Sequence, residues 1–96
     1  MKNAVKLQDI DNVAVGIEPL NKGDILYYRD QNDELQSCII KESIPIYHKA
    51  ALTPIQEGQP IIKYGECIGC ATKNIQPGEH VHIHNVVSPE KKGGLL

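Results

Sequence analysis

Three of the four histidines in the chain lie at every second position of one short segment. They are His80, His82 and His84, with a single apolar residue between neighbours. Strict alternation of polar and apolar residues predicts a β-strand over about residues 79–87, with one buried face and one face of imidazoles. Imidazoles bind transition metals and, when protonated, carboxylates. This segment is therefore the first candidate for a functional site.

Strand geometry limits how many of these histidines can share one ion. A strand rises about 3.3 Å per residue, so the backbones of His80 and His84 would lie about 13 Å apart. Positions i and i+2 are only about 7 Å apart, and their imidazoles can converge on one ion. We therefore expect His82 and His84 to bind a metal, with His48 or a carboxylate as a further ligand. Three alternatives stay open: binding of a substrate carboxylate, contact with a partner, and packing on the sheet without chemistry.

Cys67 and Cys70 have the Cys-x-x-Cys spacing of metal and redox motifs. No second pair accompanies them, and no βαβ pattern surrounds them. The sequence therefore favours two small buried thiols over a zinc site. The total of three cysteines is odd, and the N-terminus shows no signal-peptide pattern. Reduced thiols in a cytoplasmic protein are expected.

The composition indicates one small domain with an aliphatic core. The chain has 96 residues, of which 41% are hydrophobic and only 4% aromatic, all tyrosine. The net charge is −2, and no basic cluster could follow a phosphate backbone, which argues against nucleic-acid binding. No apolar run approaches the roughly 20 residues that cross a bilayer, which argues against a membrane protein.

The elements that must position the histidines are short and β-prone, which predicts an all-β fold. Strands are expected at residues 13–17, 25–28, 35–41 and 61–65, with a polar connection at 29–34 and a short segment of small side chains at 67–71. Residues 47–52 suit either one helical turn or an extended segment. We place the domain at residues 1–88 and expect a flexible tail or junction at 89–96, which is polar and glycine-rich.

A weak internal repeat connects these elements. Three glycines each follow a branched or leucine residue by three positions: Gly23 after Leu20, Gly58 after Ile55, and Gly78 after Ile75. An apolar residue follows each glycine by three positions: Leu26, Ile61 and Val81. A small residue precedes each glycine by seven positions: Gly16, Ala51 and Ala71. Each copy predicts a strand, an anchor, a turn whose glycine has positive φ, and a second strand.

Several segments together resemble a known family. In chain order they are residues 11–15, 48–49, 51–52, 61–65, 68–69, 71–72 and 78–85. They resemble the N-terminal SAF-type module of the altronate/galactarate dehydratase family, and the same module in the small subunit of sulfolactate sulfo-lyase. The resemblance covers about residues 8–87 and implies a SAF-type β-clip of long crossing hairpins. Tyr47 departs from the family, which usually has glycine before the residue that corresponds to His48.

The resemblance also implies a function and partners. It implies a small subunit of a hydro-lyase that acts with a large catalytic lyase subunit to dehydrate a sugar acid such as altronate or galactarate. A divalent metal, Fe²⁺ or Mn²⁺, would belong to the assembled enzyme, and the chain alone would be inactive. Alternatives are the small subunit of (2R)-sulfolactate sulfo-lyase and a non-catalytic module that binds sugar acids. A homo-oligomer is a further option.

Four residues are expected to bind the substrate in such an assembly. His48 and Lys49 are adjacent in one matching segment, while Lys63 and Asn85 lie in two others. Cationic side chains and an amide could hold a sugar-acid carboxylate through hydrogen bonds. For each lysine the alternative is a solvated position on a strand.

Overall fold

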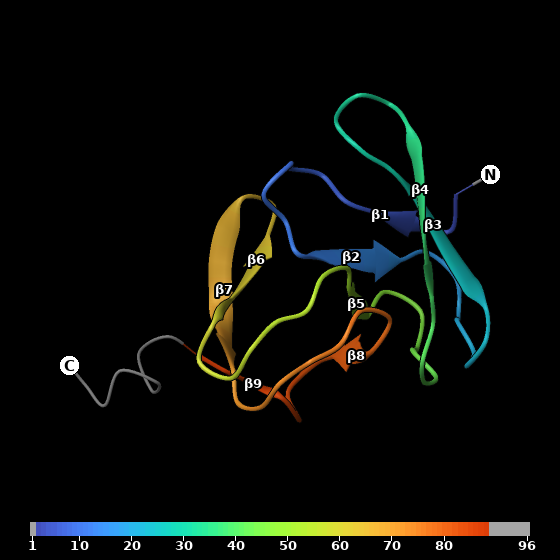
Figure 1. Cartoon of the computed structure of the whole chain (residues 1–96). Coiled ribbons are helices and arrows are strands. Elements are labelled where there is room, and N and C mark those ends of the chain that lie inside the picture. Colours follow the sequence, from blue (N-terminus) through green and yellow to red (C-terminus); the bar gives the residue numbers. More distant parts are fainter. Residues whose placement is uncertain (1, 89–96) are drawn as a thin grey trace.

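The computed structural model describes residues 2–88, which form an all-β domain (Figure 1), as the sequence predicts. The expected tail at 89–96 lies outside the described residues. The strands are β1 (Ala4–Val5), β2 (Val13–Gly16), β3 (Ile25–Arg29), β4 (Leu35–Ile39), β5 (Lys49–Ala51), β6 (Pro60–Lys63), β7 (Glu66–Ala71), β8 (His80–Val81) and β9 (Val86–Val87). The ambiguous segment at 47–52 is therefore extended. Within residues 2–88, no helix has the length and apolar character needed to span a membrane.

The strands form three small antiparallel sheets. A central sheet has the order β1-β2-β5-β8, β3 pairs with β4, and a third sheet has the order β6-β7-β9. Figure 1 shows the β3–β4 and β6–β7 hairpins on opposite sides of the central sheet. The β3–β4 hairpin uses the expected polar connection between its strands. The central sheet is thus held between two hairpins.

The repeat predicted from the sequence is confirmed, and the structure adds a fourth copy. Gly23, Gly58 and Gly78 all have positive φ, between 89° and 93°. The four anchors are buried, and two isolated bridges join them in pairs: Leu20 with Ile44, and Ile55 with Ile75. The residues three positions after the turns are completely buried: Leu26, Ala50, Ile61 and Val81. The fourth copy is hard to see in the sequence because tyrosine replaces its glycine.

The core consists of two clusters, one for each pair of anchors. The first contains Ala4, Ala14, Leu20, Leu26, Ile40, Ile44 and Ala50. The second contains Val13, Ala51, Ile55, Ile61, Ala71, Ile75 and Val81. Neighbouring residues of β2 and of β5 contribute to different clusters, because successive side chains of a strand point to opposite faces. The central sheet therefore separates two similar half-cores.

Two asparagines attach the early strands to the hairpins in the same way. Each side-chain amide donates one hydrogen bond to a hairpin carbonyl and accepts one from a hairpin N–H: Asn3 with Ile25 and Tyr27, and Asn12 with Pro60 and Ile62. All four distances lie between 2.8 and 3.0 Å. Each asparagine amide thus makes the pair of hydrogen bonds that the backbone of a further strand would make at the edge of the hairpin.

The continuous strand expected over residues 79–87 is wrong. Only β8 and β9 are extended there, and a turn at 82–85 sends the chain from the central sheet to the third sheet. Asn85 stabilises this turn, because its Oδ1 accepts the His82 N–H at 3.0 Å and its Nδ2 donates to the His80 carbonyl at 2.8 Å. Such side chain–backbone bonds compete with the extended conformation.

Tyr47 occupies the left-handed position of the fourth turn, with a φ of 69°. That conformation costs a residue with a Cβ about 1–2 kcal/mol, whereas glycine loses about 0.5–1 kcal/mol through the entropy of the unfolded chain. Because the side chain is 69% exposed, its removal sacrifices little packing. We expect Tyr47→Gly to raise the free energy of unfolding by about 0.5–1 kcal/mol. Urea denaturation measures this, and Tyr47→Ala, which keeps the strained Cβ, should not be stabilised. Equal stabilities of the two variants would contradict a strained turn.

Candidate histidine site

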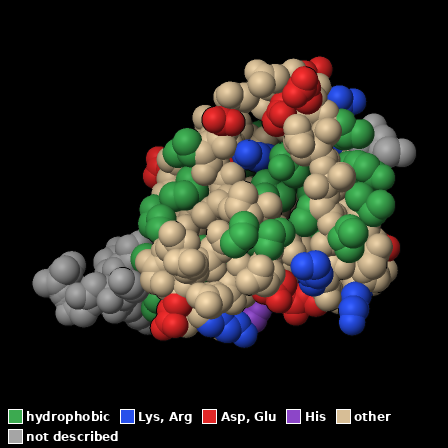
Figure 2. Space-filling model, viewed as in Figure 1, with side chains coloured by type: hydrophobic (Ala, Val, Ile, Leu, Met, Phe, Trp, Pro, Cys, Tyr) green, Lys and Arg blue, Asp and Glu red, His purple; other side chains and the backbone are tan. Residues whose placement is uncertain are grey.

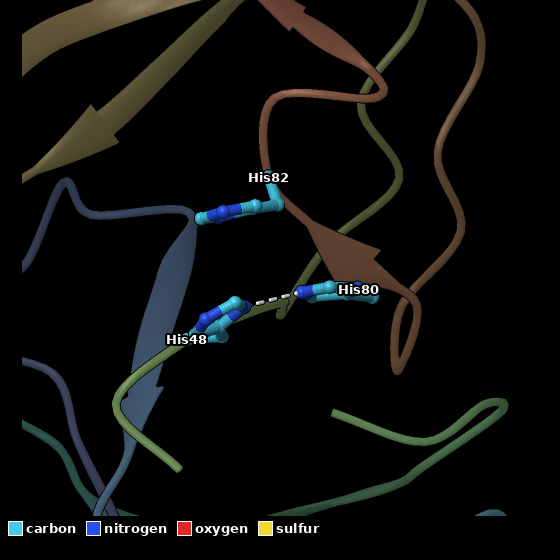
Figure 3. A group of neighbouring side chains, drawn as sticks. All are labelled: His48, His80 and His82. Atoms are coloured by element: carbon cyan, nitrogen blue, oxygen red, sulfur yellow. Dashed lines mark hydrogen bonds between the residues drawn. The ribbon is translucent and has the colours of Figure 1, made fainter. Parts of the chain in front are cut away.

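The turn before β5 differs from the other three in the residue after the left-handed position. In those three turns, side-chain oxygens of Asp24, Gln59 and Glu79 accept the backbone N–H three residues earlier, at 2.7–2.8 Å. His48 occupies this position in the fourth turn, and three residues earlier stands Pro45, which has no N–H to donate. The imidazole of His48 is therefore free of this turn and extends toward β8 (Figure 3).

The pairing of β5 with β8 brings three histidines together. Ala50 pairs with His80 in the antiparallel register, so the same register places His48 opposite His82. Nδ1 of His48 lies 2.9 Å from Nε2 of His80, and the ring centroids of His48 and His82 are 4.1 Å apart. One nitrogen from each ring lies within 4.8 Å of the other two. Figure 3 shows the three rings lying nearly parallel, with the hydrogen bond between His48 and His80 drawn.

His84 lies beside this group but does not belong to the three converging rings. The turn at 82–85 brings its ring centroid within 5.0 Å of that of His80, so the wide separation expected of an extended strand is wrong. His82 is thus grouped with His48 and His80, and the assignment of His84 as a ligand stays a prediction. Sequence reasoning missed His80 as a partner of His48 and His82. The sequence feature that could have indicated the turn at 82–85 is Asn85, whose short polar side chain favours turns.

The surroundings of His80 and His82 favour the neutral form of their imidazoles. Partial burial, followed by the neighbouring imidazoles, lowers the pKa of His80, although the nearby carboxylate of Glu42 opposes this shift. Desolvation, followed by the charges of His48 and Lys49, lowers the pKa of His82. A neutral imidazole has a lone pair for a metal ion or for a proton. The cluster can therefore act as a ligand set or as a base near neutral pH.

A pocket of about 280 Å³ adjoins the cluster. Its lining residues are Lys49, Ile68, His82, Ile83, Val86 and Ser88. Burial, and then the charge of Lys63, lower the pKa of the half-buried Lys49. None of the six lining residues is acidic, and beside Lys49, His82 and Ser88 the lining is aliphatic. In Figure 2 histidine reaches the surface at the lower edge of the domain, close to charged side chains. This arrangement suits a small molecule with a carboxylate.

The four residues expected to bind substrate have different surroundings. His48 lies in the cluster and Lys49 lines the pocket. Lys63 acts on Lys49 through its charge, and its Nζ lies 4.7 Å from the centroid of the Tyr64 ring. Asn85 is 2% exposed, and its amide bonds the backbone of the histidine turn. We infer that Asn85 positions histidines, whereas Lys49 is accessible to a ligand.

The two thiols of the Cys-x-x-Cys pair are free. The expectation that both are buried is wrong, because Cys67 is exposed while Cys70 is half-buried. Cys67 Sγ lies 3.4 Å from the carbonyl oxygen of Gly69 within β7. Among residues 2–88, the group of side chains whose geometry could hold a metal ion contains histidines and no cysteine.

Comparisons with known proteins agree with this fold. The family described as altronate/galactarate dehydratase SAF domain matches residues 2–89. Altronate dehydratase of Bacillus subtilis is 38% identical over 85 residues, which are 88% of this chain and 16% of that protein. The (2R)-sulfolactate sulfo-lyase subunit alpha of Chromohalobacter salexigens is 40% identical over 85 residues, which are 83% of this chain and 88% of that subunit. Galactarate dehydratase (L-threo-forming) of Escherichia coli is 36% identical over 86 residues, covering 90% of this chain and 15% of that enzyme.

The matched part differs greatly among these relatives. The chain spans only about one sixth of the two dehydratases but most of the sulfo-lyase subunit alpha. The family match nevertheless covers nearly the whole sequence, including the histidine turn and both hairpins. The chain therefore belongs to the altronate/galactarate dehydratase SAF domain family, as its sequence motifs predict.

Proposed function

We propose that this chain is the SAF-domain subunit of a hydro-lyase and acts with a large catalytic subunit to dehydrate a sugar acid such as altronate or galactarate. The observation that carries the proposal is the meeting of three imidazoles with a basic, partly apolar pocket on one side of the domain. Two relatives are named as dehydratases of such acids. The assembled enzyme would work in the cytoplasm.

The residues of this site suit part of a dehydration. Elimination of water needs a base for the proton next to the carboxylate and an acid for the departing hydroxyl. Lys49 would hold the substrate carboxylate. The three imidazoles fit a divalent ion such as Fe²⁺ or Mn²⁺, which would supply Lewis-acid assistance to the leaving hydroxyl.

The open side of the pocket favours completion by a partner. Ile83 lines the pocket and is 84% exposed, although it is a large apolar side chain. A second subunit over Ile83 would bury apolar surface and exclude water from Lys49 and His82. The remaining acid or base would come from that subunit. We therefore expect the isolated chain to be inactive.

Reconstitution tests this proposal. The chain is purified together with a candidate large lyase subunit and assayed with altronate, galactarate and sulfolactate. We expect dehydration of a sugar acid only when both chains are present. Lys49→Ala should lower kcat/KM by about 30–100-fold, the loss of one charged hydrogen bond. Lys73→Ala, at an exposed turn, is the matched control and should leave the rate unchanged. Full activity of the large subunit alone would overturn the proposal.

A second candidate function is that of the alpha subunit of a (2R)-sulfolactate sulfo-lyase. It is supported by the 40% identity that extends over 88% of such a subunit. Elimination of sulfite needs the same carboxylate contact and the same proton removal. Turnover of sulfolactate alone in the reconstituted assay would favour this candidate. Binding of a sugar acid by the isolated chain, without turnover in any complex, would instead favour a binding module.

A further inference from the structure

We propose that His48, His80 and His82 form a divalent-metal site that this chain completes by itself, without a partner. The proposal goes beyond the proposed function because it makes the isolated subunit the carrier of the ion, with no ligand from a partner. It concerns binding and would hold for either type of lyase. It differs from the expected pair of His82 and His84, which the turn at 82–85 no longer places on one strand face.

The nitrogen positions are close to those of a ligated ion. At metal–nitrogen distances of about 2.0–2.1 Å, the nitrogens of a tetrahedral site lie about 3.4 Å apart. His48 Nδ1 and His80 Nε2 are 2.9 Å apart, and the group of three nitrogens spans no more than 4.8 Å. Small rotations of the three side chains can bring these nitrogen–nitrogen distances to the value of a tetrahedral site. The proton in the His48–His80 hydrogen bond would move to the other nitrogen of its ring, which leaves both facing lone pairs for the ion.

The backbone around the three rings is already fixed. His48 follows a turn whose Pro45 leaves the imidazole without a capping role. The His80 N–H donates to Glu42 Oε2 at 3.0 Å. Asn85 holds the His80 carbonyl and the His82 N–H. Metal binding therefore orders side chains alone, which lowers its entropic cost.

The three rings are close enough to act as one ligand set. Their centroids are separated by 4.1–5.5 Å. Among residues 2–88, the group of converging ligand atoms comes from these three histidines, whereas Glu42 uses a carboxylate oxygen to accept the His80 backbone N–H. A divalent ion between the rings would accept all three lone pairs at once.

The ligand set indicates the class of metal and an open site. Imidazole ligands suit zinc, iron, nickel and copper, and bind manganese more weakly. Three protein ligands leave at least one position for water or a ligand oxygen, as in catalytic zinc sites. Because His82 also lines the pocket with Lys49, that open position would be close to the bound carboxylate. The site would thus serve substrate binding and not only stability.

A titration of the isolated chain tests the proposal. Metal-free protein without a polyhistidine tag is titrated with Co²⁺, followed by its visible absorption, and then competed with Zn²⁺. We expect saturation at one equivalent. His48→Gln, His80→Gln and His82→Gln should each weaken the affinity at least tenfold. His84→Gln is the matched control, because it removes an exposed imidazole of the same segment and should leave the affinity unchanged.

A second measurement needs no substitution, in case a variant does not fold. Imidazole ¹⁵N shifts of the unaltered chain should change for His48, His80 and His82 on addition of Zn²⁺, and not for His84. Absence of saturation in the titration would overturn the proposal. Loss of affinity in His84→Gln with retention in His48→Gln would overturn it in favour of the His82–His84 pair. Since no substrate or partner is present, failure of the proposed function would leave these results unaffected.

Discussion

Replacement of Gly78 by alanine is expected to lower the free energy of unfolding by about 3 kcal/mol or more. A Cβ at this position would overlap the carbonyl oxygen of Ile39 and press on Cγ of Lys41. The φ of Gly78 is 89°, so the new side chain would also be strained by its own backbone. Since the obstacle is backbone, no rotamer change can relieve it. Urea denaturation of the variant measures the loss.

Gly23→Ala is the matched control for this substitution. Gly23 occupies the same position of the first turn, with a φ of 93°, but nothing lies within 4 Å of an added Cβ. Gly23→Ala should therefore lower the free energy of unfolding by only about 1–2 kcal/mol, the cost of a Cβ at positive φ. The difference between the two variants isolates the close approach at Gly78. Equal losses would contradict the packing of the end of β4 against the turn at Gly78.

The same two variants test whether the close packing at Gly78 affects the histidine site. The Gly78 N–H donates to the Ala51 carbonyl, and its own carbonyl accepts the Lys41 N–H. Two residues later comes His80, so displacement of Gly78 would move β8 relative to β5. We expect the metal affinity to fall in Gly78→Ala and to stay unchanged in Gly23→Ala. The close approach thus helps to set the distance between His48 and His80.

Local chemistry explains how much of the fold the sequence predicts. The anchor-to-glycine spacing identifies three turns, because a left-handed position in a tight turn favours glycine whatever surrounds it. The same frame finds Leu26, Ile61 and Val81, all completely buried. These features depend on a few consecutive residues, and they are confirmed. The fourth turn has the same anchor spacing and left-handed position, but it cannot be identified by its glycine because Tyr47 stands there.

The candidate site is less predictable because it depends on nonlocal pairing. Alternation around His82 indicates a strand, but two hydrogen bonds of Asn85 favour a turn instead. His48 meets His80 only because β5 pairs with β8 in one register. A shift of one residue would place His48 on the other face, and no pattern in the sequence excludes that shift.

Asp11→Ala is expected to lower the free energy of unfolding by about 3 kcal/mol. Asp11 is 5% exposed, and its carboxylate accepts the backbone N–H groups of Gln8 at 3.1 Å, Tyr64 at 3.0 Å and Gly65 at 2.8 Å. A hydrogen bond to a charged group contributes about 1.5–3 kcal/mol. We expect the loss of stability to be smaller than the sum of three such contributions. Tyr64 and Gly65 are exposed, so water can replace part of the lost hydrogen bonding.

The carboxylate supports an otherwise strained hairpin turn. Tyr64 and Gly65 have φ values of 56° and 79°, so both residues joining β6 to β7 are left-handed, as in a type I′ turn. Their consecutive N–H groups donate to the two oxygens of the Asp11 carboxylate. Asp11→Asn keeps one acceptor oxygen but turns an amide donor toward an N–H, so its loss should be intermediate. Asp9→Ala, at a neighbouring exposed position, is the control and should change stability by less than about 0.5 kcal/mol.

Hydrogen exchange locates the effect of Asp11 within the domain. In Asp11→Ala the amides of Tyr64 and Gly65 should exchange faster than expected from global unfolding, since they lose their acceptor directly. The His80 amide, which donates to Glu42, should follow the global change only. Uniform acceleration of all three amides would contradict a local role. Because β7 carries Ile68, a wall of the pocket, a loosened hairpin should also weaken carboxylate binding while the metal affinity of the histidines is retained.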